Sequence, residues 1–289
     1  MRPRPSLVLL LAAALALAAA APAAASFPGA NGRIAFVRSV HGRSHIMSVL
    51  PGGRGLRDLS GAGSTWKDDE PQWSADGRRI VFQRCCPGGL TQVFVMSADG
   101  SGKRNLSRSA IDDTEPAFSP DGTHIAFARA GEIWVMRADG SGKRPLASAD
   151  WYEYPAWSPD GAVIAFSFFD QYYGFGNLLR VPAAGGAATS IGPPGSERRP
   201  DWAPDGSRLI FENAPLYTPQ IWVASPWGKN AHRLRADAAG DEDPAYAPAG
   251  DRIVFVRDTT PQTILTMPAA GGRARSVTSG RAPAWQPLP

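Results

Sequence analysis

The segment Pro155-Ala-Trp-Ser-Pro-Asp-Gly-Ala-Val-Ile-Ala-Phe166 decides the fold of this chain, because its pattern returns along most of the sequence. It consists of a proline, an aromatic residue two positions later, a tight turn, and a strand of the form aliphatic-x-Phe. The proline and aromatic pairs that open the repeats are Pro71/Trp73, Pro116/Phe118, Pro155/Trp157, Pro200/Trp202, Pro244/Tyr246 and Pro283/Trp285. Successive prolines lie 45, 39, 45, 44 and 39 residues apart. A period in this range is typical of a propeller or a solenoid.

Each repeat contains four short segments that the sequence predicts to be strands. The Pro-Asp-Gly turn joins the first two, because proline presets φ and glycine supplies a positive φ. A third apolar run follows, such as Ile133–Met136, then a second glycine turn, such as Asp139-Gly140, and a short fourth strand. Four strands in about 44 residues is the composition of a propeller blade. The 31 Gly and 27 Pro residues also favour turns over long helices.

The two ends of the chain complement each other. The segment Asn31–Phe36 begins at the turn and second strand of a repeat, whereas Pro283–Trp285 supplies a first strand. Pairing these two segments would close the ring and remove the exposed sheet edges of a linear array. We therefore expect an all-β, six-bladed β-propeller over residues 27–289, with a closing blade formed by three N-terminal strands plus one C-terminal strand.

The first 26 residues have the features of a secretory signal peptide. A basic start, Met1–Pro5, precedes an apolar stretch of about 15 residues, Leu7–Ala21, and Ala24-Ala25-Ser26 offers a cleavage site. This stretch is shorter than the roughly 20 residues that cross a bilayer as a helix. We expect residues 1–26 to be removed and the protein to be periplasmic or secreted, with no transmembrane segment after cleavage.

The charge balance argues against a nucleic-acid partner. The formal net charge is +4, and no run of basic residues is longer than two. Nucleic-acid-binding proteins instead gather Lys and Arg into patches or stripes. We expect no nucleic acid among the partners. We also expect the protein to be a monomer.

The two cysteines, Cys85 and Cys86, are adjacent, so they cannot join distant parts of the fold. Three states are open: a vicinal disulfide, two free thiols, or an intermolecular bridge or metal site. We predict the vicinal disulfide in exported protein, because the following Pro87-Gly-Gly89 permits an unusual backbone.

The repeated string, most complete at Pro116–Phe127 and Pro155–Phe166, resembles the WD-like repeat of TolB-type β-propellers. The resemblance covers residues 27–289 and implies the propeller fold. Proteins with such repeats include the periplasmic TolB translocation component, propeller domains of prolyl-oligopeptidase-like enzymes, and some lyases that act on sugars. This sequence departs from TolB in lacking its N-terminal α/β domain. It departs from the peptidases in lacking a hydrolase domain and a Gly-x-Ser-x-Gly elbow.

Acidic residues gather in the segments that enter each blade, at one face of the ring. They are Asp68, Asp69, Glu70, Asp112, Asp113, Glu115, Asp150, Glu153, Glu197, Asp241, Glu242 and Asp243. One interpretation is a site for a cation, including Ca²⁺, or for a basic peptide at the channel mouth. The other is pairing with a recurrent arginine at the end of the second strand, represented by Arg38, Arg84, Arg129 and Arg257. We favour the ion pairs and expect no metal ion.

One set of aromatic residues does not follow the repeat. Eight of them fall in the two blade-four loops that we place on the ligand face: Trp151, Tyr152, Tyr154, Phe168, Phe169, Tyr172, Tyr173 and Phe175. Clustered exposed rings mark interfaces and stacking platforms, although these rings could instead form a small core under a long loop. We predict a ligand site made of these rings, with Arg198 and Arg199 holding an acidic group.

The absence of a recurring nucleophile, base and orienting group favours a non-enzymatic binding module over an enzyme. The expected partner is a protein, peptide or glycan of the cell envelope, and we expect no cofactor. The alternative is a propeller hydrolase or lyase that uses acids and a histidine at the channel mouth.

Overall fold

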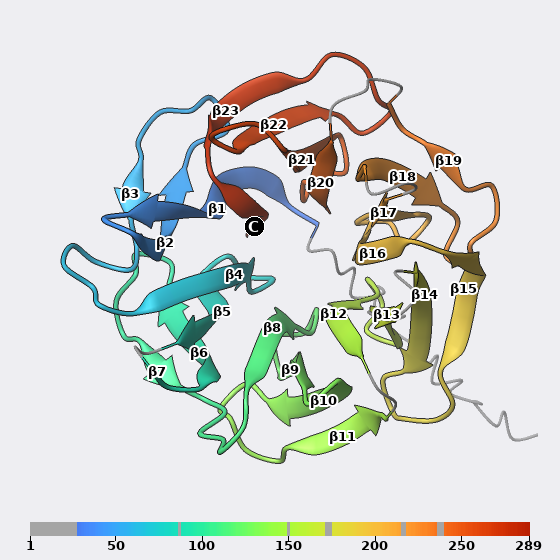
Figure 1. The fold of residues 1–289 in the computed structure, drawn as a ribbon, viewed down its shortest axis with the longest axis horizontal. Coiled ribbons are helices and arrows are strands. Elements are labelled where there is room, and N and C mark those ends of the chain that lie inside the picture. The colour runs from blue at the N-terminus through green and yellow to red at the C-terminus, as the bar shows by residue number, and fades with distance from the viewer. Residues whose placement is uncertain (1–27, 86–87, 149–150, 171–174, 215–217, 236–239) are drawn as a thin grey trace, which may run out of the picture.

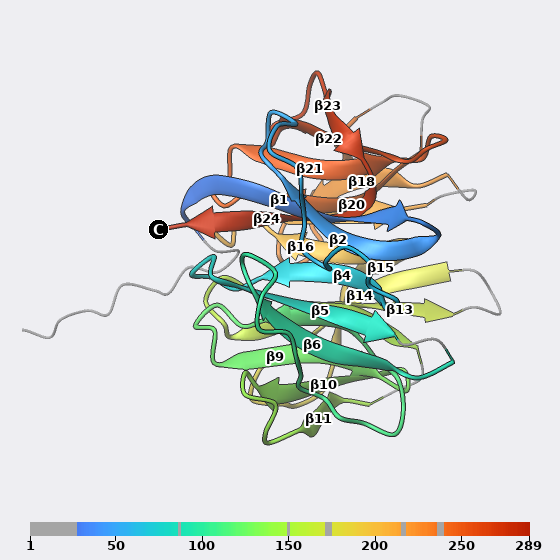
Figure 2. The same cartoon turned by 90° about the vertical axis from the view of Figure 1, so that its left-hand side faces the viewer.

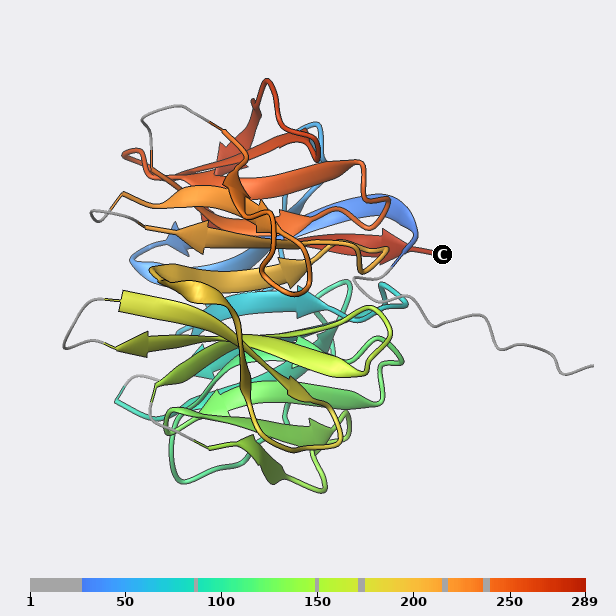
Figure 3. The same cartoon turned by 90° about the vertical axis from the view of Figure 1, so that its right-hand side faces the viewer.

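The protein is described here from a computed structural model that covers residues 28–289 apart from 86–87, 149–150, 171–174, 215–217 and 236–239. These described residues form 24 strands in six four-stranded antiparallel sheets and contain no helix. The sheets are arranged as blades around a central axis (Figure 1). Edge-on views show a flattened ring, with the end of the last strand emerging at one of its two faces (Figures 2 and 3).

Blades one to three occupy the first half of the ring, and each is given from its inner to its outer strand. Blade one consists of β24 (Arg281–Leu288), β1 (Ala30–Val40), β2 (Arg43–Val49) and β3 (Arg57–Asp58). Blade two consists of β4 (Lys67–Trp73), β5 (Arg79–Cys85), β6 (Thr91–Ser97) and β7 (Arg104–Asn105). Blade three consists of β8 (Asp113–Phe118), β9 (His124–Arg129), β10 (Glu132–Arg137) and β11 (Arg144–Ala147).

Blades four to six complete the ring in the same order. Blade four consists of β12 (Tyr152–Trp157), β13 (Val163–Asp170), β14 (Phe175–Pro182) and β15 (Thr189–Gly195). Blade five consists of β16 (Glu197–Trp202), β17 (Leu209–Asn213), β18 (Gln220–Ala224) and β19 (His232–Arg233). Blade six consists of β20 (Asp241–Tyr246), β21 (Arg252–Arg257), β22 (Thr263–Pro268) and β23 (Arg275–Ser279).

The ring closes through the C-terminal strand. β24 pairs antiparallel with β1, and Trp285 lies opposite Ile34 in that pairing. β1 continues the sheet through β2 to β3, so blade one combines one C-terminal and three N-terminal strands. The prediction of a six-bladed propeller with this closing blade is confirmed.

The core lies between neighbouring blades and is built from the repeated positions. Phe82 and Phe127 of the second strands are fully buried, as is Trp73 of an inner strand. One cluster joins Val93 of blade two to Phe118 and Phe127 of blade three, and the other blade junctions have equivalent clusters. The fold is therefore held by blade-to-blade packing of the residues that define the repeat.

The Pro-Asp-Gly turns are stabilised locally. In blade four the Asp160 carboxylate accepts hydrogen bonds from the Ser158 hydroxyl (2.6 Å) and the Ala162 N–H (2.9 Å). Gly161 has a φ of 69°, a conformation that glycine adopts without the penalty of a side chain. These hairpins lie at one face, called here the turn face. The blade-entry connections and the loops between second and third strands lie at the other, called here the entry face.

Candidate functional site

A β-bulge occurs at the same place in every inner strand. The residue immediately before the repeat proline has a positive φ, between 46° and 53°, and these residues are Glu70, Glu115, Tyr154, Arg199, Asp243 and Ala282. The pairing register with the second strand shifts at this point in each blade. A following proline disfavours the right-handed helical region, and a bulge turns a side chain out of the strand's alternation. We call these six residues the pre-proline ring.

The pre-proline ring surrounds a cavity of about 130 Å³ on the propeller axis. The six repeat prolines line the same cavity directly after the ring residues. The ring therefore forms the entry-face end of this cavity.

The Arg199 guanidinium crosses the ring. Its Nη1 lies 2.8 Å from Asp243 Oδ1 and 3.4 Å from Glu70 Oε1, and its Nη2 donates to the Tyr154 hydroxyl at 2.8 Å. It also lies over the Tyr154 ring, 4.1 Å from the centroid. Tyr154 and Asp243 come from the two neighbouring blades, whereas Glu70 comes from the blade opposite. One side chain thus ties four blades together.

Burial perturbs the titration of this ring. Burial raises the pKa of Glu70 to about 7, an effect that Arg199 opposes and Asp243 reinforces. Burial also raises the pKa of Glu115 to about 8, with a further upward contribution from the Glu153 carboxylate. Burial lowers the pKa of Arg199, but the Glu70 and Asp243 carboxylates outweigh it and raise this pKa well above the ordinary value. The ring thus holds carboxyl groups that bind protons near neutral pH.

The residues one position earlier in the inner strands add further charge. Arg281 forms a bidentate ion pair with Asp69. Burial raises the pKa of Glu242 to about 7, with added repulsion from Asp243, and Glu242 accepts a hydrogen bond from Gln262 at 2.5 Å. Together the two levels contain six carboxylates, Asp69, Glu70, Glu115, Glu153, Glu242 and Asp243, and three arginines, Arg198, Arg199 and Arg281. With all nine groups ionised the formal charge at the channel mouth is −3, and this charge moves toward zero as Glu70, Glu115 and Glu242 take up protons near neutral pH.

Three other acids of the blade-entry segments, Asp68, Asp113 and Asp241, form the ion pairs that the sequence led us to expect. Bidentate ion pairs join Arg84 to Asp68 (2.6 and 2.7 Å), Arg129 to Asp113 (2.6 and 2.8 Å) and Arg257 to Asp241 (2.8 and 3.1 Å). In blade one Arg38 differs, because it donates to the backbone carbonyl of Ser279. The ion-pair interpretation is confirmed for these three blades.

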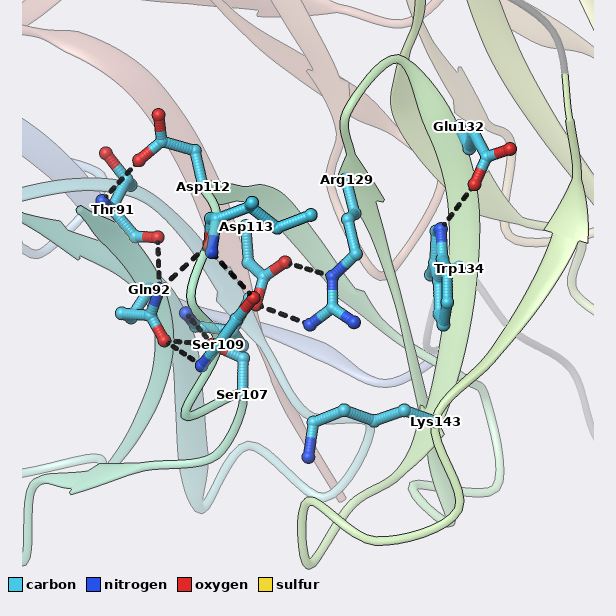
Figure 4. A network of polar contacts seen from close by, with 12 residues as sticks. Thr91, Gln92, Ser107, Ser109, Asp112, Asp113, Arg129, Glu132, Trp134 and Lys143 are labelled. Atoms are coloured by element: carbon cyan, nitrogen blue, oxygen red, sulfur yellow. Dashed lines mark hydrogen bonds and ion pairs between the residues drawn. The ribbon is translucent and has the colours of Figure 1, made fainter.

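The Asp113–Arg129 pair belongs to a wider network that fixes an entry loop (Figure 4). Ser109 N–H donates to Gln92 Oε1 at 2.6 Å, and Gln92 Nε2 donates to the Ile111 carbonyl at 3.1 Å. The Thr91 N–H donates to Asp112 at 2.6 Å. The connection into blade three is therefore held in one conformation against blade two.

The structure divides the predicted aromatic set. Trp151 is 43% exposed on the entry face, and Tyr154 lies in the pre-proline ring. Tyr152 is buried and packs on Phe166, with 4.7 Å between ring centroids, and on Phe168 at 6.3 Å. Tyr152 and Phe168 thus belong to the core between blades three and four.

The remaining predicted residues fall into three groups. Phe169 and Phe175 lie on the paired strands β13 and β14. Tyr172 and Tyr173 lie outside the described residues. Arg198 is half-buried on β16, one position before Arg199. The structure therefore brings Tyr154 and Arg199 into direct contact at the channel.

The predicted disulfide partner Cys86 also lies outside the described residues. Cys85 ends β5, and its thiol contacts the Gly89 carbonyl at 3.2 Å.

The three acids of the pre-proline ring were not distinguished, from the sequence, from the acids that pair with arginine. Position relative to the repeat proline distinguishes the two groups in the sequence. Glu70, Glu115 and Asp243 each stand directly before a repeat proline, whereas Asp68 stands three residues before one.

No group of three or more His, Cys, Asp or Glu side chains that could hold a metal ion occurs among the described residues. Within the same part of the chain, no helix is long and apolar enough to span a membrane.

Comparisons with known proteins agree with this architecture. The chain is 26% identical over 196 residues to an uncharacterized protein of Agrobacterium fabrum, across 65% of each chain. It is 38% identical over 80 residues to a Tol-Pal system protein TolB of Novosphingobium aromaticivorans, across 27% of this chain and 17% of that protein. The chain thus spans less than two thirds of the curated relatives that it matches.

The fold is also similar to a solved structure. The crystal structure of TolB from Acinetobacter baumannii superimposes with a TM-score of 0.75 at 18% identity, across 89% of this chain and 67% of that one. At this identity the likeness concerns the fold alone. The family model of the TolB beta propeller domain matches residues 13–193, more than half of the sequence. The chain belongs to the TolB β-propeller domain family.

Proposed function

We propose that this protein is an exported, non-enzymatic binding module that holds a protein or peptide of the cell envelope against its entry face. The signal-peptide features of residues 1–26 support export. Membership of the TolB β-propeller family supports an interaction role.

The observation that carries the proposal is the chemistry of the pre-proline ring. Six equivalent backbone positions share a strained, positive-φ conformation, yet they present two glutamates, an aspartate, an arginine, a tyrosine and an alanine. Left-handed backbone at non-glycine residues costs about 1–3 kcal/mol each, and such strain concentrates at functional sites. A purely structural ring would be expected to repeat one residue type, as the turn and core positions do.

The charge at the mouth favours a partner with basic side chains. Six carboxylates outnumber three arginines there, and the pKa values of Glu70 and Glu115 are raised by burial. A lysine or arginine of the partner would favour the ionised carboxylates and relieve their mutual repulsion. The same argument disfavours an acidic glycan at the centre of the face.

Exposed aromatic side chains on the same face provide apolar contact area. Trp151 lies in the connection into blade four, and Trp66, 39% exposed, lies in the connection into blade two. Tryptophan beside charged groups is the composition of binding hot spots. We assign Trp151, Trp66 and the pre-proline ring to one binding surface.

A second candidate function is that of a hydrolase, or of a lyase that cleaves its substrate by elimination, at the channel mouth. Carboxyl groups with pKa values near 7–8, such as Glu70 and Glu115, are suited to proton transfer at neutral pH. However, the described residues that line the cavity include no histidine, serine or cysteine that could act as a nucleophile or base beside them. The binding role therefore has the stronger support.

The test is quantitative capture from an envelope extract with the mature chain as bait. Trp151→Ala and Glu153→Gln should each reduce the captured partner at least tenfold. Trp227→Ala is the matched control, since Trp227 is 62% exposed in a hairpin of the turn face. Equal losses for Trp151→Ala and Trp227→Ala, with unchanged melting temperatures, would overturn the assignment of the face.

A further inference from the structure

The channel beneath the pre-proline ring has walls that break the repeat at two places. Two residues after each pre-proline residue, the inner strands present Ala117, Ala156, Ala245 and Ala284 in four of the blades. Blade five presents Asp201 and blade two presents Gln72 at the equivalent position. All six residues line the axial cavity, and blades two and five lie opposite each other across it (Figure 1).

The Asp201 carboxylate has hydrogen bonds but no counter-ion in the described part of the chain. Its Oδ2 accepts the Tyr246 N–H at 2.7 Å, and the backbone N–H of Trp202 also stabilises the carboxylate. Burial raises its pKa to about 7 despite these two donors. No ion pair of Asp201 occurs among the residues described, whereas Asp68, Asp113 and Asp241 each have an arginine.

Asp201 is part-buried, and a carboxylate without a counter-ion in such a place is costly, whereas alanine would avoid this cost. Four blades have alanine at this position, so the repeat architecture does not require an acid there. The cavity is lined by alanines, the repeat prolines, Trp157 and Trp285, and at its entry-face end by the charged side chains of the pre-proline ring. The cavity, at about 130 Å³, is large enough to hold ordered water or a small organic molecule.

We propose that this cavity is a binding site for a small primary amine with a short apolar body, in its ammonium form. The ammonium group donates to Asp201, and the alkyl chain lies against Ala156 and Ala245. Gln72, whose amide both donates and accepts, faces the other end of the ligand and suits a neutral polar group there. The ligand enters from the turn face, where Pro248 lines the cavity, because Arg199 crosses the entry-face end.

This site adjoins the proposed partner surface, because the pre-proline ring lines the entry-face end of the same cavity. It lies below the prolines, and its charge comes from one aspartate rather than from the pre-proline ring. Binding of the amine is measured on the mature protein without a partner, so its failure can be distinguished from failure of the proposed partner surface.

The test is a titration of the mature protein with n-butylammonium at pH 8, followed by calorimetry and by amide chemical shifts. We expect saturable binding with shifts at Tyr246 and Trp202, and no comparable binding of 1-butanol, which has a similar shape without the charge. Asp201→Asn keeps an acceptor for the Tyr246 N–H and should weaken binding at least tenfold. Asp201→Ala, which installs the residue of four other blades, should fold and bind no better than Asp201→Asn.

Asp205→Asn is the matched control, because Asp205 caps an exposed turn through Ser207 outside the cavity. It should bind n-butylammonium as the wild type does. Absence of saturable binding to folded wild-type protein would overturn the proposal. Equal affinity of the wild type and Asp201→Asn would overturn it as well, and so would equal affinity for 1-butanol.

Discussion

Replacing Arg199 with leucine removes the cation that links the pre-proline ring. The substitution keeps much of the side-chain volume but leaves Glu70 and Asp243 facing each other without the guanidinium that lies 3.4 and 2.8 Å from them. Removing one partner of a buried ion pair costs about 3–5 kcal/mol. Arg199 is 25% exposed, so water reaches the site, and we expect a cost of about 2–3 kcal/mol at pH 8.

The loss of unfolding free energy caused by Arg199→Leu should be larger at high pH than at low pH. The pKa of Glu70 is raised from 4.5 to about 7, so the stability linked to this carboxyl is fully present below pH 4.5 and is lost as the pH rises through 7. At pH 5 Glu70 is protonated and tolerates the loss of Arg199. At pH 8 its charge is uncompensated, so the penalty should be larger by at least about 1 kcal/mol.

The assay is urea unfolding of the wild type and Arg199→Leu at pH 5 and pH 8, followed by tryptophan fluorescence. Arg144→Leu serves as control, because Arg144 is exposed and, within the described part of the chain, its side chain donates to the Ala183 carbonyl and forms no ion pair. Adding Glu70→Gln to Arg199→Leu should recover part of the stability at pH 8. A variant as stable as the wild type at both pH values would refute the role given to Arg199.

Four further predictions concern other parts of the fold. Deleting residues 282–289 should leave the protein largely unfolded, since loss of the buried Trp285 alone costs about 3–5 kcal/mol of a typical total of about 5–15; a cooperative, unshifted melt would contradict the ring closure. Arg129→Ala should lower the free energy of unfolding by about 3–5 kcal/mol, because it leaves the buried Asp113 carboxylate without its arginine. In urea unfolding, the double variant Asp113→Ala/Arg129→Ala should lose less than the sum of the two single variants. Additive losses would speak against the ion pair. Glu115→Gln should stabilise the protein at pH 9 but not at pH 4. The pKa of Glu115 is raised to about 8, so the folding stability linked to this carboxyl is lost as the pH rises through that value. Calorimetry showing no gain at pH 9 would count against this burial effect. Thiol counting on denatured, exported protein should find neither Cys85 nor Cys86 reactive, and two titratable thiols would exclude the vicinal disulfide.

The architecture could be predicted from sequence because its determinants are local and repeated. The proline–aromatic pairs recur in all six blades and the following turn in five of them, so each repeat supports the interpretation of the next. Ring closure was also predictable, since Pro283–Trp285 supplies the strand that Asn31–Phe36 lacks. The pairing of Arg84 and Arg129 with acids followed from the same regularity.

The site was predicted only in part, because its geometry depends on a backbone irregularity. Simple strand alternation does not distinguish Tyr152 from Tyr154, yet the bulge before Pro155 places Tyr154 in the channel while Tyr152 packs on Phe166. Sequence clustering grouped both residues with Trp151 as one aromatic surface. The position of Asp201 in the channel likewise follows from its place after the bulge, which no composition or charge count reveals.

The most direct test of the binding face is site-specific photocrosslinking in cells that produce the protein. A photoreactive phenylalanine analogue would replace Trp151 on the entry face in one strain and Trp227 on the turn face in another. The two side chains are 43% and 62% exposed, so accessibility alone favours the turn-face probe. We predict a discrete crosslinked product from position 151 that an added Arg199→Leu substitution weakens, and none from position 227. A product from position 227 with none from position 151 would contradict the proposed binding face.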